Sequence, residues 1–235
     1  MYGKIYLVPV PIGDEEIKSS IPGNVKEVVD FLNYFIVENV RTARRFIRKL
    51  SKDKDIDSIT FFTLNKNTPT TKIAEFLTPA IQGNNIGIIS EAGAPGVADP
   101  GGEIVSLAHK KDIEVIPLVG PSSIILALMA SGFNGQNFAF RGYLPIKKHE
   151  RIQALKKIEK TSKTEKQTQI FMEAPYRNNQ LLSAILDACD NNTALCIASN
   201  ITSSNEFIKT KIIGEWKKHI PDLNKQPTIF LLSSE

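Results

Sequence analysis

Short apolar runs alternate with amphipathic stretches over the first half of the chain. The nearly continuous apolar runs, typical of strands buried on both faces, lie at residues 5–10, 34–37, 59–63, 86–90 and 115–118. Between them, apolar residues recur at i, i+3 and i+4, which predicts helices at residues 24–32, 42–50, 71–81 and 102–109. Strands that alternate with helices form right-handed crossovers, so the first half predicts a mostly parallel sheet with flanking helices.

The second half also predicts an α/β unit. An apolar helix of small residues at 124–130 comes first. The remaining strands are expected at residues 138–141, 168–172, 195–198, 207–212 and 228–232, with helices at 148–160 and 179–189. Closely spaced strands near the C-terminus favour a mixed sheet. The fold class is therefore two-domain α/β, with domains at residues 1–117 and 118–235 and a ligand cleft between them.

Composition excludes several classes of protein. The 235 residues are 42% apolar and include 2 Cys, too apolar for a disordered chain and too poor in Cys for a disulfide scaffold. Cys189 and Cys196 lack Cys-x-x-Cys spacing and are expected to be buried thiols; with three scattered His, no metal site is predicted. No apolar stretch approaches the ~20 residues that span a bilayer, and no signal peptide is recognisable. We therefore expect a cytoplasmic protein without membrane attachment.

The charge is divided unevenly. Residues 1–117 carry 14 basic and 15 acidic side chains, whereas residues 118–235 carry 15 and 10. Two basic clusters stand out: residues 41–54 hold seven bases and one acid, and residues 141–166 hold nine bases and three acids. Such clusters are either solvated helix faces or an electrostatic footprint for RNA, and charge alone does not separate the two.

Three loops have the composition of ligand-binding segments. Residues 90–102 follow a buried strand and contain four Gly and two Pro, with Glu91 and Asp99 as either ligand-facing or capping acids. Residues 8–14 and 120–123 are the other two loops, the latter readable as a plain helix start. Neither a Gly-x-Gly-x-x-Gly fingerprint nor a phosphate loop occurs, which disfavours dehydrogenase and NTP hydrolysis chemistry.

Six motifs in a fixed order resemble the tetrapyrrole (corrin/porphyrin) methylase superfamily. They are Leu-Val-Pro-Val-Pro-Ile-Gly at 7–13, Ser-Glu-Ala-Gly-Ala-Pro-Gly-Val-Ala-Asp-Pro-Gly at 90–101, Val-Gly-Pro-Ser-Ser at 119–123, Ala-Ser-Gly at 130–132, Arg-Gly-Tyr-Leu-Pro at 141–145 and Glu-Ala-Pro-Tyr-Arg at 173–177. Within the superfamily the chain is most similar to the small-subunit ribosomal RNA methyltransferase I branch, which methylates a cytidine 2'-hydroxyl. The resemblance extends from residue 7 to about residue 196.

The resemblance implies a homodimeric enzyme that binds S-adenosylmethionine between its two domains. The implied cofactor contacts coincide with the three loops: Pro11, Gly13, Glu91, Ala92, Gly93, Pro95, Gly96, Val97, Ala98, Pro121, Ser122 and Ser123. Methyl transfer from a sulfonium is an in-line displacement that needs no metal. The protein must align the acceptor with the methyl carbon and remove the acceptor's proton.

Five polar residues that follow apolar strands are candidates for acceptor chemistry: Glu38, Arg41, Asn65, Glu173 and Arg177. Glu173 could orient or deprotonate the acceptor, and the planar fork of Arg177 could hold a phosphate or carboxylate. The alternative for these two residues is an internal ion pair.

Several positions depart from the pattern of that branch. Glu38-Asn39-Val40-Arg41 stands where Glu-Asp-Thr-Arg is expected, and Ser90-Glu91-Ala92-Gly93-Ala94 where Ser-Asp-Ala-Gly-Thr is expected. Tyr176 replaces a usual His, and Ala198-Ser199-Asn200 an expected Ala-Arg-Glu. Relatives commonly carry a C-terminal extension, whereas this chain ends at residue 235. These departures concern the acceptor more than the cofactor.

The sequence thus favours an S-adenosylmethionine-dependent methyltransferase acting on small-subunit ribosomal RNA, with 2'-O-methylation as the specific reaction. Two alternatives stay open. One is methylation of a tetrapyrrole or other small molecule, which the basic second half disfavours. The other is a catalytically impaired homologue that binds cofactor or RNA, which the altered polar positions suggest.

Overall fold

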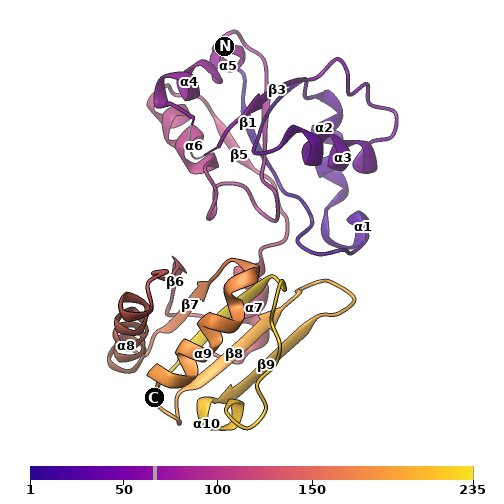
Figure 1. Cartoon of the computed structure of the whole chain (residues 1–235). Coiled ribbons are helices and arrows are strands. Elements are labelled where there is room, and N and C mark those ends of the chain that lie inside the picture. The colour runs from indigo at the N-terminus through magenta and orange to yellow at the C-terminus, as the bar shows by residue number, and fades with distance from the viewer. Residues whose placement is uncertain (66–67, 235) are drawn as a thin grey trace. The chain divides into compact units, whose positions relative to one another are not determined.

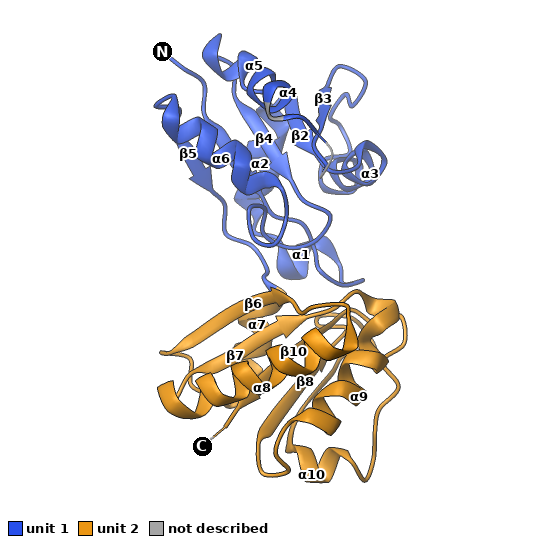
Figure 2. Cartoon of the chain, turned by 60° about the vertical axis from the view of Figure 1, so that its left-hand side comes forward, with its two compact units in different colours: residues 1–122 blue, residues 123–235 orange. Residues whose placement is uncertain are grey.

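A computed structural model describes residues 1–65 and 68–234. The chain forms two compact units, Met1–Ser122 and Ser123–Glu235 (Figure 2). The division falls shortly after the boundary at residues 117–118 that the sequence pattern suggests; Glu235, the end of the predicted second domain, lies outside the described residues. Within the described part of the chain, no helix has the length and apolar character needed to cross a membrane.

Unit 1 contains the predicted parallel sheet. Its strands are β1 (Ile5–Val8), β2 (Tyr34–Val37), β3 (Thr60–Thr63), β4 (Ile86–Ile89) and β5 (Val115–Pro117), in the order β3-β2-β4-β1-β5 (Figure 1). Every neighbouring pair is parallel, with Ile5 opposite Ile86 in β1–β4 and Tyr34 opposite Thr60 in β2–β3. All carboxyl ends of the strands therefore lie at one edge of the sheet, where open α/β folds bind ligands.

Helices cover both faces of this sheet. They are α1 (Ile17–Ser20), α2 (Gly23–Phe31), α3 (Val40–Leu50), α4 (Thr70–Glu75), α5 (Thr78–Ile81) and α6 (Gly101–Lys110). Successive β2 residues belong to different cores: Phe35 packs with α2 and α3, and Ile36 packs with α4, α5 and α6. This alternation is the period-2 geometry of a strand that is buried on both sides.

One predicted helix is wrong: residues 71–81 do not form a single helix. The segment forms α4 and α5 instead, and Pro79 lies at the start of α5. A proline inside a helix lacks an amide hydrogen, and its ring collides with the carbonyl four residues earlier. That carbonyl belongs to Glu75, the last residue of α4.

Unit 2 contains the mixed sheet. Its strands are β6 (Phe138–Tyr143), β7 (Thr168–Met172), β8 (Ala194–Ser199), β9 (Phe207–Ile212) and β10 (Thr228–Ser233), in the order β6-β7-β10-β8-β9. The β6–β7 pair is parallel and the other three pairs are antiparallel. The fold class predicted from the sequence, a two-domain α/β protein with a parallel and a mixed sheet, is confirmed.

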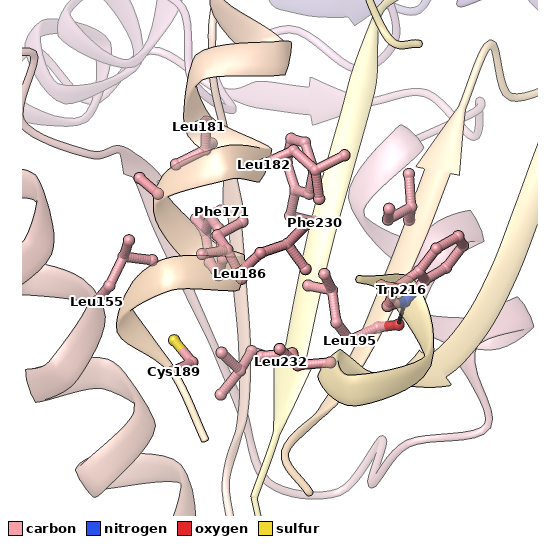
Figure 3. Close-up of a cluster of buried hydrophobic side chains, with 14 of the residues drawn as sticks. Leu155, Phe171, Leu181, Leu182, Leu186, Cys189, Leu195, Trp216, Phe230 and Leu232 are labelled. Carbon is pink, nitrogen blue, oxygen red and sulfur yellow. Dashed lines mark hydrogen bonds between the residues drawn. The ribbon is translucent and has the colours of Figure 1, made fainter. Parts of the chain in front are cut away.

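The helices of unit 2 are α7 (Ser123–Ser131), α8 (Lys148–Glu165), the 3-10 turn η1 (Pro175–Arg177), α9 (Asn178–Ala188) and α10 (Ile213–Trp216). A core between the sheet and α8, α9 and α10 contains Phe171 and Phe230, stacked with ring centroids 6.0 Å apart (Figure 3). The buried Trp216 indole donates a hydrogen bond to the carbonyl oxygen of Leu195 at 2.9 Å. Helix α7 instead contacts β8, β9 and β10 with residues outside this core.

Candidate active site

The predicted ligand loops of unit 1 leave the carboxyl edge of the parallel sheet. Residues 9–14 follow β1, residues 38–39 follow β2, residues 90–100 follow β4, and residues 118–122 follow β5. Strand order places β1 between β4 and β5, so the loops after these three strands start side by side.

Backbone contacts join the loops directly. Val10 and Gly93 exchange two hydrogen bonds, with N–O distances of 3.0 and 3.1 Å. Gly93 has φ +73°, and a Cβ there would lie 3.1 Å from Ile12 Cγ2 and 3.2 Å from the Pro121 carbonyl oxygen. A Cβ on Gly120 would lie 2.1 Å from Pro9 Cβ, which excludes any side chain at that position. The structure thus brings together the three loops that sequence reasoning identified separately.

A concave pocket of about 390 Å³ opens beside these loops. Pro11 and Gly13 line it from the first loop, Glu91 from the loop after β4, and Thr42 from α3. The volume lies in the range of small-molecule sites. Ala92, Gly93, Pro95, Gly96, Val97 and Ala98 lie outside the described lining, as do Pro121 and Ser122; Ser123 is the first residue of α7 in unit 2.

Glu91 lines the pocket, and Glu38 lies next to Glu91 but outside the lining. Thr42 Oγ donates a hydrogen bond of 2.6 Å to Glu91 Oε1, and the Glu91 backbone amide donates one of 3.4 Å to Glu38 Oε1. The predicted Glu38 and Glu91 are therefore neighbours. Thr42 is a site residue that sequence reasoning missed, because its contact with Glu91 joins residues 49 apart in the chain.

Asp99 closes the loop after β4. Its carboxylate accepts hydrogen bonds from the backbone amides of Gly96, at 2.9 and 3.0 Å, and of Gly101, at 2.7 Å. Burial raises the pKa of the Asp99 carboxyl, while the two amides act in the opposite direction by stabilising the charged form. Asp99 is thus a capping residue that fixes the loop, one of the two roles considered from the sequence.

Arg41 and Asn65 are less closely connected to the pocket. Arg41 is exposed on the first turn of α3, where its backbone amide donates to the Asn39 side chain at 2.9 Å. Asn65 follows the edge strand β3, and its backbone amide donates to Thr68 Oγ at 2.9 Å. Neither residue lines the described pocket. The structure therefore adds nothing to their predicted roles in acceptor binding.

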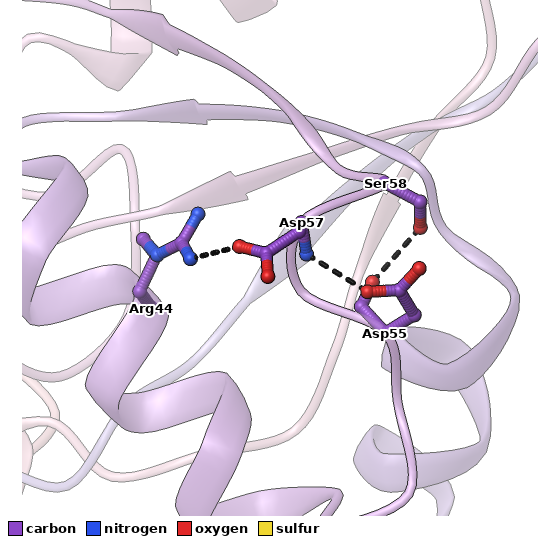
Figure 4. Close-up of polar contacts among 4 residues, drawn as sticks. All are labelled: Arg44, Asp55, Asp57 and Ser58. Atoms are coloured by element: carbon purple, nitrogen blue, oxygen red, sulfur yellow. Dashed lines mark hydrogen bonds and ion pairs between the residues drawn. The ribbon is translucent and has the colours of Figure 1, made fainter.

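The basic cluster at residues 41–54 is partly neutralised. Arg44 forms an ion pair with Asp57, and this pair lowers the pKa of the Asp57 carboxyl (Figure 4). Asp57 is itself held by Asp55, whose side chain accepts from the Asp57 backbone amide at 3.1 Å. Arg45 and Lys49, by contrast, line the pocket from α3. They bring positive charge to the same concave surface as Glu91.

Glu173 and Arg177 form a second polar group, in unit 2. Glu173 follows β7 with 1% of its side chain exposed, and its Oε1 lies 2.6 Å from Arg177 Nη2 and 2.7 Å from the Ala174 amide. The hydrogen bond that Arg177 donates to Glu173 raises the pKa of Arg177. Among the described residues, Glu173 Oε2 and Arg177 Nε are buried without a hydrogen-bond partner. The internal ion pair considered from the sequence exists, but it leaves one carboxylate oxygen unused.

Tyr176, at the position where the branch usually has His, supports this pair. Arg177 Nη1 donates to the Tyr176 hydroxyl at 3.0 Å, and the guanidinium carbon lies 5.0 Å from the ring centroid. Ser199 and Asn200, two further departures, both donate to Gln226 Oε1, at 3.1 and 3.0 Å. At these positions the altered residues make structural contacts of their own.

The described residues of unit 1 fit a small cationic cofactor. Close backbone approach at Gly93 and Gly120 leaves no room for side chains there, and the pocket lining holds three acids, Asp14, Glu15 and Glu91, against two bases, Arg45 and Lys49. A parallel α/β unit of this kind, followed by a mixed α/β unit, defines a two-unit α/β protein with a candidate small-molecule pocket in its first unit.

Comparisons with known proteins identify the family. The family model described as Tetrapyrrole (Corrin/Porphyrin) Methylases matches residues 4–215. The chain belongs to this family of methyltransferases.

Its curated relatives include proteins named Ribosomal RNA small subunit methyltransferase I. The protein of Buchnera aphidicola subsp. Schizaphis graminum is 32% identical over 98% of this chain and 78% of its own length. The protein of Escherichia coli O157:H7 is 28% identical over 98% of this chain and 77% of its own length. The protein of Bacillus subtilis strain 168 is 30% identical over 90% of this chain and 70% of its own length.

Solved structures show the same fold at low identity. The methyltransferase CobJ superposes with a TM-score of 0.66 at 13% identity, covering 99% of this chain and 94% of that one. Uroporphyrin-III-C-methyltransferase from Thermus thermophilus has a TM-score of 0.57 at 15% identity, covering 98% of this chain and 94% of that one. The resemblance inferred from the six motifs is confirmed.

Proposed function

We propose that this methyltransferase uses S-adenosylmethionine to methylate a ribose 2'-hydroxyl of small-subunit ribosomal RNA. The observation that carries the proposal is the convergence of the loops after β1, β4 and β5 beside a pocket that Glu91 lines, with Glu38 next to Glu91. The names of the relatives supply the substrate class. The small-molecule alternative has no comparable support from those names.

The cofactor supplies an electrophilic methyl group on a positively charged sulfur. Pro11, Gly13 and Glu91 would hold it at the pocket, with the bridge between Val10 and Gly93 keeping the two loops in register. Glu38 and Glu91 favour a cationic ligand by direct electrostatic attraction. Asp99 keeps the loop rigid through its bonds to Gly96 and Gly101, so that little ordering is required on binding.

The acceptor hydroxyl must lose a proton as its oxygen bonds to the methyl carbon. Glu173 is proposed to receive that proton on Oε2, because Oε1 already accepts from Arg177 and the Ala174 amide. Arg177 would orient Glu173 and bind a neighbouring RNA phosphate through its remaining donors. Glu38, Arg41 and Asn65 are proposed to contact the acceptor nucleotide.

Incubation with tritiated S-adenosylmethionine and small ribosomal subunits from a strain lacking this enzyme tests the proposal. We expect label in the RNA, retained in alkali-resistant dinucleotides because a methylated 2'-oxygen cannot attack the adjacent phosphate. Label released as single nucleotides would contradict 2'-O-methylation. Binding of S-adenosylhomocysteine without label in any RNA would favour the catalytically impaired homologue. Homodimer formation and a cytoplasmic location stay predictions from the sequence.

A further inference from the structure

A groove of about 1320 Å³ runs along α8 in unit 2. Its basic wall consists of Lys156, Lys160 and Lys163 of α8 and Lys166, the residue that caps this helix. The opposite wall comes from residues 132–134, 190, 192–194, 212 and 233–234. None of the lining residues belongs to the candidate active site.

The lysines share one face of a regular helix. Lys156, Lys160 and Lys163 are spaced by four and three residues, which aligns them over about 10 Å of helix axis. All four side chains are exposed. Within the described part of the chain, Lys156, Lys160 and Lys166 form no ion pair, so their charge is available to a ligand. The lining also contains two acids, Glu159 and Asp190, so its lysines outnumber its acids by four to two.

Hydrogen bonds join α8 to the opposite wall of the groove. Glu159 Oε1 accepts from Thr193 Oγ at 2.6 Å and from the Asp190 amide at 2.8 Å, so this carboxylate is directed at that wall. At the end of α8, the carbonyl of Lys166 accepts from Asn134 at 3.2 Å, and that of Glu165 accepts from Asn137 at 2.8 Å. The lysine row is therefore presented by a rigid helix.

We propose that this groove, the α8 lysine groove, binds the ribose–phosphate backbone of the substrate RNA away from the nucleotide that is methylated. Aligned ammonium groups neutralise successive phosphates without reading bases, and they release counterions as they do so. The net charge of unit 2 is +5, whereas unit 1 has net charge −1, which directs a polyanion to unit 2. The inference rests on the proposed RNA substrate and adds a positioning surface to it.

The test compares two double variants of equal charge. Lys156→Ala/Lys160→Ala removes two groove lysines, and Lys148→Ala/Lys157→Ala removes two lysines of the same helix that do not line the groove. Alanine suits exposed helical positions, so both variants should fold. The readouts are the salt dependence of binding to naked small-subunit ribosomal RNA, the KM and kcat for methyl transfer to small ribosomal subunits, and the affinity for S-adenosylhomocysteine.

We expect the slope of log K against the logarithm of salt concentration to be less negative by about 1.4 in the groove variant, because each lost phosphate contact removes about 0.7. Its KM for small ribosomal subunits should rise about tenfold, with kcat at saturation and S-adenosylhomocysteine affinity unchanged. Equal behaviour of the two variants would overturn the inference. So would a groove variant that binds naked RNA normally but intact subunits poorly, since that result would assign the groove to a ribosomal protein. If the unaltered enzyme labels no RNA, the proposed function itself fails, independently of the variants.

Discussion

The two oxygens of Glu173 have different surroundings. This difference makes it possible to distinguish a residue that only positions Arg177 from one that accepts a proton. Oε1 is occupied by Arg177 and the Ala174 amide, whereas Oε2 has no partner among the described residues. An unused oxygen on a buried carboxylate is unfavourable unless it interacts with something that is present only during function.

Glu173→Gln keeps the shape and an acceptor for Arg177 but removes the ability to take a proton. We expect kcat to fall by about 100-fold or more, while S-adenosylhomocysteine affinity stays within twofold. Single-turnover methyl transfer and calorimetry measure the two quantities. Glu165→Gln, at an exposed position at the end of α8, is the control and should change neither. Full activity in Glu173→Gln would reduce Glu173 to an anchor for Arg177.

Asp99 gives a prediction about stability and pH. Because burial raises its pKa in the folded state, the folded protein binds this proton more tightly than the unfolded chain. Asp99 has a pKa of about 4 in the unfolded chain. As the pH rises from that value through the higher pKa of the folded state, ionisation of Asp99 lowers the free energy of unfolding. Asp99→Asn has no such ionisation, so its stability relative to the unaltered protein should increase across that pH window.

Asp99→Ala separates this charge effect from the capping effect. Alanine cannot accept from the Gly96 and Gly101 amides, so we expect the free energy of unfolding to fall by about 1–2 kcal/mol at neutral pH. Urea unfolding followed by far-UV circular dichroism, at about pH 4 and pH 7, measures both variants. If Asp99→Ala were as stable as Asp99→Asn, the loop would not depend on these hydrogen bonds.

At the scale of elements, α3 and the loop after β4 are coupled through one hydrogen bond. Thr42 Oγ lies 2.6 Å from Glu91 Oε1, so the first turn of α3 holds a carboxylate that lines the pocket. We expect Thr42→Val and Glu91→Ala each to weaken S-adenosylhomocysteine binding, with a coupling energy of about 0.5–1.5 kcal/mol in the double variant. Calorimetry on the four proteins measures it. Thr42→Ser retains the hydroxyl and should bind normally, whereas strictly additive effects would show that the contact does not contribute.

Element types were predictable where burial imposes a strong pattern. The expected strands at residues 34–37 and 168–172 coincide with β2 and β7, where a run of mostly apolar residues marks the buried positions. Helix ends were less predictable. Helix α8 continues five residues past the expected end at residue 160, where Ser162 is buried and accepts a hydrogen bond from the Ser234 amide. That contact joins residues 72 apart, so no local pattern signals it.

The same limit applies to the site. Motifs identified the three loops, but not the pairing of Val10 with Gly93 or of Thr42 with Glu91, because each pair joins distant parts of the sequence. The role of Asp99 was ambiguous for the opposite reason. A loop acid that caps a turn and one that faces a ligand have the same sequence signature, and only the bonds to Gly96 and Gly101 distinguish them.

At the scale of the whole molecule, cofactor binding and RNA binding should respond differently to salt. The pocket lies in unit 1, with net charge −1, and would hold a small ligand mostly through loop contacts, whereas unit 2 has net charge +5 and carries the α8 lysine groove. Four lysine–phosphate contacts give a slope of about −2.8, which is about a 50-fold loss of RNA affinity between 50 and 200 mM salt.

Initial rates of methyl transfer at several salt concentrations test this difference. The KM for small ribosomal subunits should rise steeply with salt, while the KM for S-adenosylmethionine changes less than threefold, because a single small charged ligand releases few counterions. S-adenosylhomocysteine affinity at each salt concentration provides the control for the integrity of the pocket. An equal rise in both KM values would mean that salt acts on the fold or on the pocket. It would contradict the prediction that the cofactor and the RNA depend on the charges of different units.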